Sequence, residues 1–158
     1  MTMAIPAYYS LIHVGSSGPD VALVQTWLNG IRDPCTWHGI LAVDGSFGTG
    51  SEKAVMEFQL RNRLTADGKV GLATWNALYS KYTAKHGLGA PYPGIALRTG
   101  MAGGTVRLLQ QKLNTLGETL SSDGKFGAAT AAAVRRFQAR NHLTADGVVG
   151  VTTWNKLF

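Results

Sequence analysis

Four Asp-Gly pairs are the residues best placed to do chemistry in this chain, and the chemistry they suggest is recognition of an anion by the backbone. The aspartates are Asp44, Asp67, Asp123 and Asp146. Each loop runs into a predicted helix start, where backbone N–H groups lack intrahelical partners and the helix dipole favours negative charge. A second glycine in each loop adds no side chain, so a ligand carboxylate could approach the backbone closely. These glycines are Gly48, Gly71, Gly127 and Gly150.

The same loops also have a purely structural interpretation, because Asp side chains commonly tie down turns. The residues that accompany the loops are Phe47, Thr74, Trp75, Phe126, Thr153 and Trp154. The tryptophans lie on an inward helical stripe, so they serve either as core or, if an indole edge is exposed beside the loop, as part of a ligand site. We include all fourteen residues in the candidate binding set. Gln59 and Gln138 are expected to hydrogen-bond the loop backbone from inside, because a buried amide must be paired.

Catalytic and metal chemistry have little support in the sequence. The four histidines, His13, His38, His86 and His142, show neither H-x-x-x-H nor H-E-x-x-H spacing. A single cysteine, Cys35, excludes an internal disulfide and a Cys-based metal cluster. Cys35 and His38 could be imagined as nucleophile and base, but no third group is present to orient them. No carboxylate pair stands out as a glycosidase site. We therefore predict no catalytic residue, metal or cofactor, and no enzyme activity.

Three short helices in each half of the chain are expected to position the loops. The first begins at Pro19, carries Val21, Val24 and Leu28 at the i, i+3, i+7 spacing of a buried stripe, and should stop at Gly30. The second helix should bury Ala54, Val55 and Phe58 and end near Asn62. In copy two it should bury Ala133, Val134 and Phe137 and end near Asn141. The third, about two turns long, should bury Leu72, Trp75, Leu78 and Tyr79, or Val151, Trp154, Leu157 and Phe158. β-branched alternation is nearly missing, so we expect little or no sheet.

The two halves are copies of one unit. Residues 44–79 and 123–158 share 21 identities in 36 positions at an offset of 79. Matches upstream need an offset of 85, so copy one carries a six-residue insertion between Gly30 and Val43. A repeat of this kind indicates one structural unit built twice. We assign residues 5–80 to the first unit and 90–158 to the second, joined by a Gly- and Pro-containing linker at 81–89.

Composition describes a globular chain, with 45% hydrophobic and 15% charged residues. No apolar run approaches the roughly 20 residues of a membrane span, so we expect no membrane partner. The net charge of +6 is uneven, because residues 1–79 carry five Lys/Arg against six Asp/Glu and residues 80–158 carry ten against three. This excess indicates either solvated helix faces or attraction to a polyanion. The Arg61–Arg63 and Arg135–Arg136 clusters lack interleaved aromatics, so nucleic acid is the weaker partner.

Taken together, the Asp-Gly-x-Phe-Gly loop, the Ala-Val-x-x-Phe-Gln helix and the Asp-Gly-x-Val-Gly-x-x-Thr-Trp segment resemble the peptidoglycan-binding domain of type 1. The resemblance covers about residues 12–79 and 97–158. It implies an all-α fold of two tandem three-helix bundles and a role in anchoring wall hydrolases, phage lysins or spore proteins to bacterial cell wall. Family members often have proline after the loop glycine, where this chain has Thr49, Leu72, Ala128 and Val151. The same bundle serves as a cysteine-bearing propeptide in some metalloproteases, but Cys35 lies within the first unit rather than beyond it.

We therefore predict a non-catalytic protein that binds the stem peptide or glycan of peptidoglycan through two modules. One alternative is the targeting portion of a phage or bacterial lysin whose hydrolase domain lies elsewhere, and a second is a small basic nucleic-acid-binding protein. The N-terminal residues MTMAIPAYYSLIHVG lack the pattern of a secretory signal. We expect a cell-wall or extracellular location, reached by another route such as phage- or spore-associated release.

Overall fold

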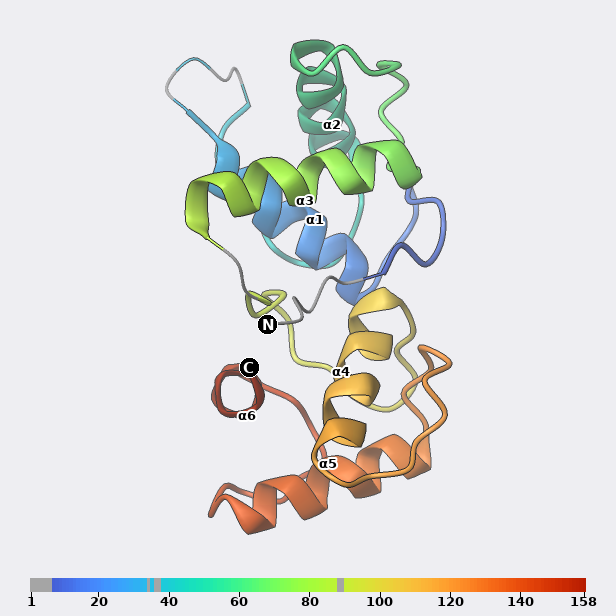
Figure 1. Ribbon diagram of the computed structural model, residues 1–158. Coiled ribbons are helices and arrows are strands. Elements are labelled where there is room, and N and C mark those ends of the chain that lie inside the picture. The colour runs from blue at the N-terminus through green and yellow to red at the C-terminus, as the bar shows by residue number, and fades with distance from the viewer. Residues whose placement is uncertain (1–6, 34, 36–37, 88–89) are drawn as a thin grey trace.

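The computed structural model describes residues 7–33, 35, 38–87 and 90–158, and over these residues it shows six α-helices with isolated β-bridges but no strand. The helices are α1 Pro19–Ile31, α2 Thr49–Arg61, α3 Leu72–His86, α4 Gly104–Thr115, α5 Ala128–Arg140 and α6 Val151–Leu157. Helices α1–α3 form one unit and α4–α6 the other, stacked end to end (Figure 1). The predicted all-α fold of two three-helix units is confirmed. None of the helices described is long and apolar enough to cross a bilayer.

Each unit has its own apolar core. In the first, Trp27 of α1 meets Trp75 of α3 edge to face at 4.8 Å, with Val24 and Leu28 buried alongside. In the second, Val106, Leu109 and Leu113 of α4 and the predicted residues of α5 are buried around Trp154. The helical spacing of these residues accounts for the burial, because i, i+3, i+7 positions share one face. The assignment of units to residues 5–80 and 90–158 stays a prediction.

Three residues expected in the core are exposed instead. Leu72 and Val151 are 57% and 52% exposed, and Phe158 lies partly exposed against Trp154. Leu72 and Val151 are the first residues of α3 and α6, and helical side chains lean toward the helix N-terminus. At this position the lean carries the side chain out over the preceding loop. The inward stripe of each third helix therefore starts at Thr74 or Thr153.

Two predictions about helix ends in the first unit are wrong. Gly30 does not stop α1 in a left-handed conformation but lies inside it, where the ring of Tyr82 occupies the space that a Cβ would need. Helix α3 continues through His86, so residues 81–86 of the expected linker are helical. This extra length is held by α1, because His86 Nε2 lies 2.7 Å from the Gly30 carbonyl and Lys85 donates to that of Arg32.

A segment before the first helix of each unit ties down both Asp-Gly loops. Ile12 and Val70 exchange two backbone hydrogen bonds of 3.2 and 2.8 Å, and Gly15 donates to Phe47 at 3.0 Å. In the second unit Leu97 and Val149 pair in the same way. The loop backbone on this side is therefore satisfied within the unit, and its opposite side is left to face solvent.

The two units meet through a buried aspartate. The Gly104 N–H donates to Asp20 Oδ2 at 2.7 Å, and the Thr105 N–H and hydroxyl donate to Oδ1 at 2.8 and 2.7 Å. Asp20 of α1 thus accepts hydrogen bonds from the first turn of α4, which has no side-chain cap of its own. Burial raises the pKa of Asp20, while the hydrogen bonds from Thr105 and Gly104 oppose that rise.

Contacts across the interface are reciprocal. A Cβ on Gly124 of the second unit would meet the Tyr9 ring, and a Cβ on the matching Gly45 would meet Ile95. Asp20 and Thr105 are themselves equivalent positions of the two copies at the offset of 85. Equivalent residues touch each other only near a two-fold axis, so the units are related by an approximate two-fold rather than by translation.

Replacing Asp20 with Ala is expected to loosen the contact between the units. It leaves the buried N–H groups of Gly104 and Thr105 without their acceptor, which should lower the free energy of unfolding by about 2 kcal/mol. Urea denaturation followed by tryptophan fluorescence measures this loss. Thr105→Val alone should cost less, and the double variant should cost less than the sum of the two single changes. Additive costs would show that the pair does not couple the units.

Candidate functional site

All four Asp-Gly loops are built around one buried glutamine each. Gln138 Nε2 lies 3.0 Å from Asp146 Oδ1, 2.9 Å from the Val148 carbonyl and 3.2 Å from Thr153 Oγ1, while its Oε1 accepts the Gly147 N–H at 2.9 Å. The other three loops repeat these contacts through Gln25, Gln59 and Gln110. The predicted inward role of Gln59 and Gln138 is confirmed.

Sequence reasoning missed the corresponding roles of Gln25 and Gln110. Both glutamines lie on the first helix of their unit and are buried. The available signal was the match of Gln25 to Gln110 within otherwise apolar stripes. The same pattern also relates the two loops of one unit. Each loop has the sequence Asp-Gly-x-(Phe/Val)-Gly-x-x-(Ser/Thr), and its glutamine lies on the preceding helix.

The four loop aspartates are exposed, and one carboxylate oxygen of each accepts hydrogen bonds within its own turn. Oδ1 of Asp67 accepts from Lys69 N–H at 3.0 Å as well as from Gln59. The backbone N–H two residues on lowers the pKa of each of these carboxyls, as expected when a hydrogen bond favours the charged form. The loops therefore carry ionised aspartates at neutral pH. Asp44, Asp67, Asp123 and Asp146 fix their turns, as the structural interpretation predicted.

The loop glycines are the N-caps of the following helices, as expected. Gly48, Gly71, Gly127 and Gly150 precede α2, α3, α5 and α6 with extended backbone, and no side chain among the described residues caps these helices. A Cβ built on Gly150 would meet nothing within 4 Å, and one on Gly71 only the Leu11 side chain at 3.9 Å. Open space beside these glycines leaves the backbone accessible to a ligand.

The remaining predicted site residues lie inside the protein. Trp75 and Trp154 are each 1% exposed, and Phe47 and Phe126 are also core residues. The Trp154 indole N–H donates to the Ala90 carbonyl at 2.8 Å. The hydroxyls of Thr74 and Thr153 are buried against the loop glutamines. These six residues support the loops from within, and of them only Thr153 also lines the groove of the second unit.

A groove in the second unit brings several of the predicted residues together. It has a volume of about 510 Å³ and is lined by Gln138, His142, Leu143, Thr144, Asp146, Val148, Gly150, Val151, Thr152 and Thr153. Val151 contributes an apolar side chain at the rim. His142 lies just after the Asn141 cap of α5 with φ of 58°, and Arg63 repeats this left-handed conformation in the first unit. In both units this left-handed residue ends the second helix and turns the chain toward the following Asp-Gly loop.

The first loop of unit one lies elsewhere. Asp44, Gly45 and Ser46 line a hollow of about 480 Å³ at the junction of the units, with Ile95 and Met101 of the second unit on its other wall. The predicted residues therefore lie partly at the junction and partly in the groove beside Gly150, and do not form one site.

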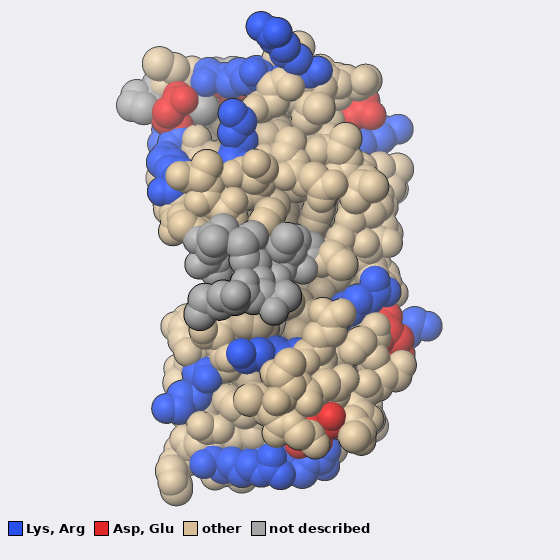
Figure 2. All heavy atoms as spheres, viewed as in Figure 1, with Lys and Arg blue, Asp and Glu red and all other residues tan. Residues whose placement is uncertain are grey.

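The charge distribution shows no single basic stripe on the face seen in Figure 2. Lys and Arg lie over both units and toward both ends, with uncharged surface between them. Among the described residues, no group of three or more His, Cys, Asp or Glu is arranged to hold a metal ion. The grooves offer exposed carboxylates, backbone, hydroxyls and apolar rims.

Comparison with known proteins points to one family. A family model described as "Putative peptidoglycan binding domain" matches residues 17–78 and 102–157. The zinc D-Ala-D-Ala carboxypeptidase of Streptomyces albus G is 45% identical over 65 residues, which are 39% of this chain and 26% of that protein. The N-acetylmuramoyl-L-alanine amidase CwlL of Bacillus licheniformis is 31% identical over 165 residues, 94% of this chain and 45% of the amidase. The chain thus spans less than half the length of either relative.

Among solved structures, a peptidoglycan-binding protein from Clostridioides difficile in complex with glutamine hydroxamate is 40% identical. The match covers 40% of each chain, with a TM-score of 0.39.

Proposed function

The chain belongs to the peptidoglycan-binding domain family, and on that premise we propose that it binds bacterial cell-wall peptidoglycan through its two repeated units. In the second unit the groove at the loop before the third helix, beside Gly150, is the proposed site, and in the first unit the equivalent loop beside Gly71 takes this role. The protein then acts at the cell wall or outside the cell.

The observation that supports this proposal best is the groove beside Gly150. It combines an open glycine backbone, the hydroxyls of Thr144 and Thr152 and the apolar Val151. A stem peptide carries carboxylates and short apolar side chains on an amide backbone, so these groups match its chemistry. The framework around Gln138 holds the loop in place before the ligand arrives, which reduces the entropy lost on binding.

We propose that the units bind wall without cleaving it. The candidate residues contain no nucleophile paired with a base and no metal cluster within the described part of the chain. Both curated relatives are wall hydrolases at least twice as long as the matched segment. A role as the targeting portion of such a hydrolase, acting with a catalytic domain, is the second candidate.

Sedimentation with purified, teichoic-acid-free peptidoglycan tests the proposal. The protein is expected to co-sediment without releasing reducing sugars or free amines. If the protein sediments with untreated cell wall but not with teichoic-acid-free peptidoglycan, its basic surface binds teichoic acid instead. Product release abolished by one point substitution would overturn the binding-only function. Tight, salt-sensitive binding to duplex DNA would favour the nucleic-acid alternative.

A further inference from the structure

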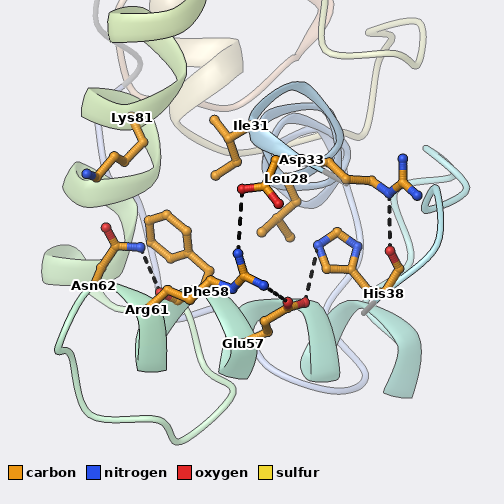
Figure 3. A pocket seen from close by; sticks show the side chains of 10 residues that line it. Leu28, Ile31, Asp33, His38, Glu57, Phe58, Arg61, Asn62 and Lys81 are labelled. Carbon is orange, nitrogen blue, oxygen red and sulfur yellow. Dashed lines mark hydrogen bonds and ion pairs between the residues drawn. The ribbon is translucent and has the colours of Figure 1, made fainter. Parts of the chain in front are cut away.

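The first unit contains a pocket that the wall-binding grooves do not include. It lies between the end of α1, the C-terminal half of α2 and α3, and its volume is about 320 Å³. Figure 3 shows its lining: Leu28, Ile31, Arg32, Asp33, His38, Glu57, Phe58, Arg61, Asn62 and Lys81. The side chains of Leu28, Ile31 and Phe58 form an apolar wall, and the opposite side carries the charges.

This pocket depends on features that copy two lacks. Asp33 and His38 belong to the segment between Gly30 and Val43, where copy one carries six more residues. Glu57 is replaced in copy two by Arg136, which pairs with Glu118 on the surface. Two copies so similar elsewhere differ here in charge sign and in loop length. The second unit therefore serves as an internal comparison for the pocket.

The charged side chains form a row with Arg61 at its centre. Arg61 Nη2 lies 3.0 Å from Glu57 Oε1 on the inner side, and Nη1 lies 3.5 Å from Asp33 Oδ2 on the outer side. Glu57 also faces His38 Nε2 at 3.7 Å, and these two side chains are 5% and 7% exposed. In Figure 3 the Arg61 guanidinium lies between the two carboxylates. The inner contact is thus short and buried, whereas the outer one is longer and open to solvent.

Lys81 adds a further positive charge at the rim. Within the described part of the chain its ammonium takes part in no ion pair of the structure. The lining carries three cationic side chains against two carboxylates, so it is net positive. Glu57 is already held by Arg61 and His38. Lys81 reaches the pocket from α3, on the side away from Asp33 (Figure 3).

We propose that this pocket binds a small molecule with a free carboxylate beside a short apolar group, such as the C-terminal residue of a peptide. The ligand carboxylate takes the place of Asp33 on the outer face of Arg61, and Lys81, which lines the pocket from α3, adds attraction. The apolar group packs on Leu28, Ile31 and Phe58. Asp33 is an internal competitor that occupies the anion position when the pocket is empty. The site is private to the first unit and does not rest on the proposed wall binding.

Titration of the ¹⁵N-labelled full chain by NMR tests the proposal, with N-acetyl-glycyl-valine as the probe and its C-terminal carboxamide as the comparison. Amide shifts are expected around Arg32, Glu57 and Lys81 and not in the second unit, including at Arg136, the equivalent of Glu57. The carboxamide should bind about tenfold more weakly, because it loses a charge-assisted contact. Equal binding of the two probes, or shifts confined to the second unit, would overturn the assignment.

Two substitutions are predicted to act in opposite directions. Lys81→Gln should weaken binding of the carboxylate probe about threefold, and Asp33→Asn should tighten it about threefold. The asparagine keeps an oxygen for the Cys35 N–H, which lies 2.8 Å from Asp33 Oδ1, so the turn is retained. Lys53→Gln, on the exposed side of α2, is the matched control and should leave affinity unchanged. Weaker binding by Asp33→Asn, in a variant whose spectrum shows an intact fold, would contradict the competitor role.

Discussion

Gly150→Trp should reduce retention of the full chain on insoluble peptidoglycan by on the order of 10²-fold. The indole would fill the groove of the second unit and convert a two-site binder into a one-site binder. A polymer presents many copies of one epitope, so the second engagement is effectively intramolecular and its loss removes avidity without touching the first unit. Gly150 has a φ of −83° and open space around its Cβ position, so the fold should accept the change.

Three comparisons make this result interpretable. Gly39→Trp places the same side chain at an exposed glycine with nothing within 4 Å, away from both grooves, and should retain wall binding. Gly71→Trp should match the loss seen with Gly150→Trp, and the double variant should lose retention almost completely. Binding to a soluble muropeptide should fall only about twofold in each single variant, because one of two equivalent sites remains. Undiminished sedimentation of both single variants would refute binding at these loops.

Gln138→Met is expected to lower the free energy of unfolding by about 3 kcal/mol. Methionine has a similar volume but offers neither donor nor acceptor, so the buried Gly147 N–H and the Val148 carbonyl lose their partner together. An unsatisfied buried polar group costs about 1–3 kcal/mol, and two are created at once. Urea denaturation monitored by circular dichroism gives the difference.

Gln111 supplies the matched control. It lies next to the buried Gln110 on α4 but is exposed, so Gln111→Met should change stability by less than about 0.5 kcal/mol. Equal costs at Gln111 and Gln138 would mean that the glutamine framework contributes nothing beyond helix propensity. Loss of stability together with loss of wall retention is also expected for Gln138→Met, because the same contacts shape the groove.

Much of the fold followed from the sequence because its signals are local. The apolar stripe of α1 and the Asn62 and Asn141 ends of the second helices depend only on spacing within one helix, and they were predicted correctly. The all-α, two-unit architecture followed from the repeat. The exposure of Leu72 and Val151 was mispredicted, since helical spacing alone does not show where the first turn leaves the core.

Other features depend on contacts between distant parts of the chain. From the sequence alone Gly30 predicts the end of α1. Its contact with Tyr82, which lies on another helix, is visible only in the structure. The hydrogen bonds of Asp20 to Thr105 join residues 85 apart and exist only once both units are folded and docked. The charged pocket around Arg61 could not be inferred from the repeat, since the insertion has no counterpart in copy two. Of the candidate site, the Asp-Gly loops, their glycines and the inward position of Trp75 and Trp154 followed from the sequence, whereas the hydrogen bonds of the Thr74 and Thr153 hydroxyls with the loop glutamines needed the structure.

The approximate two-fold at the Asp20 junction has a consequence for polarity. Glycan strands and stem peptides are directional, with chemically distinct ends. Two sites related by translation would read such a chain in the same direction, whereas sites related by a two-fold axis read it in opposite directions. Under the proposed two-site binding, with the units held as they are by Asp20, the protein would join two antiparallel chains, or hold one chain that folds back, rather than follow a single straight strand.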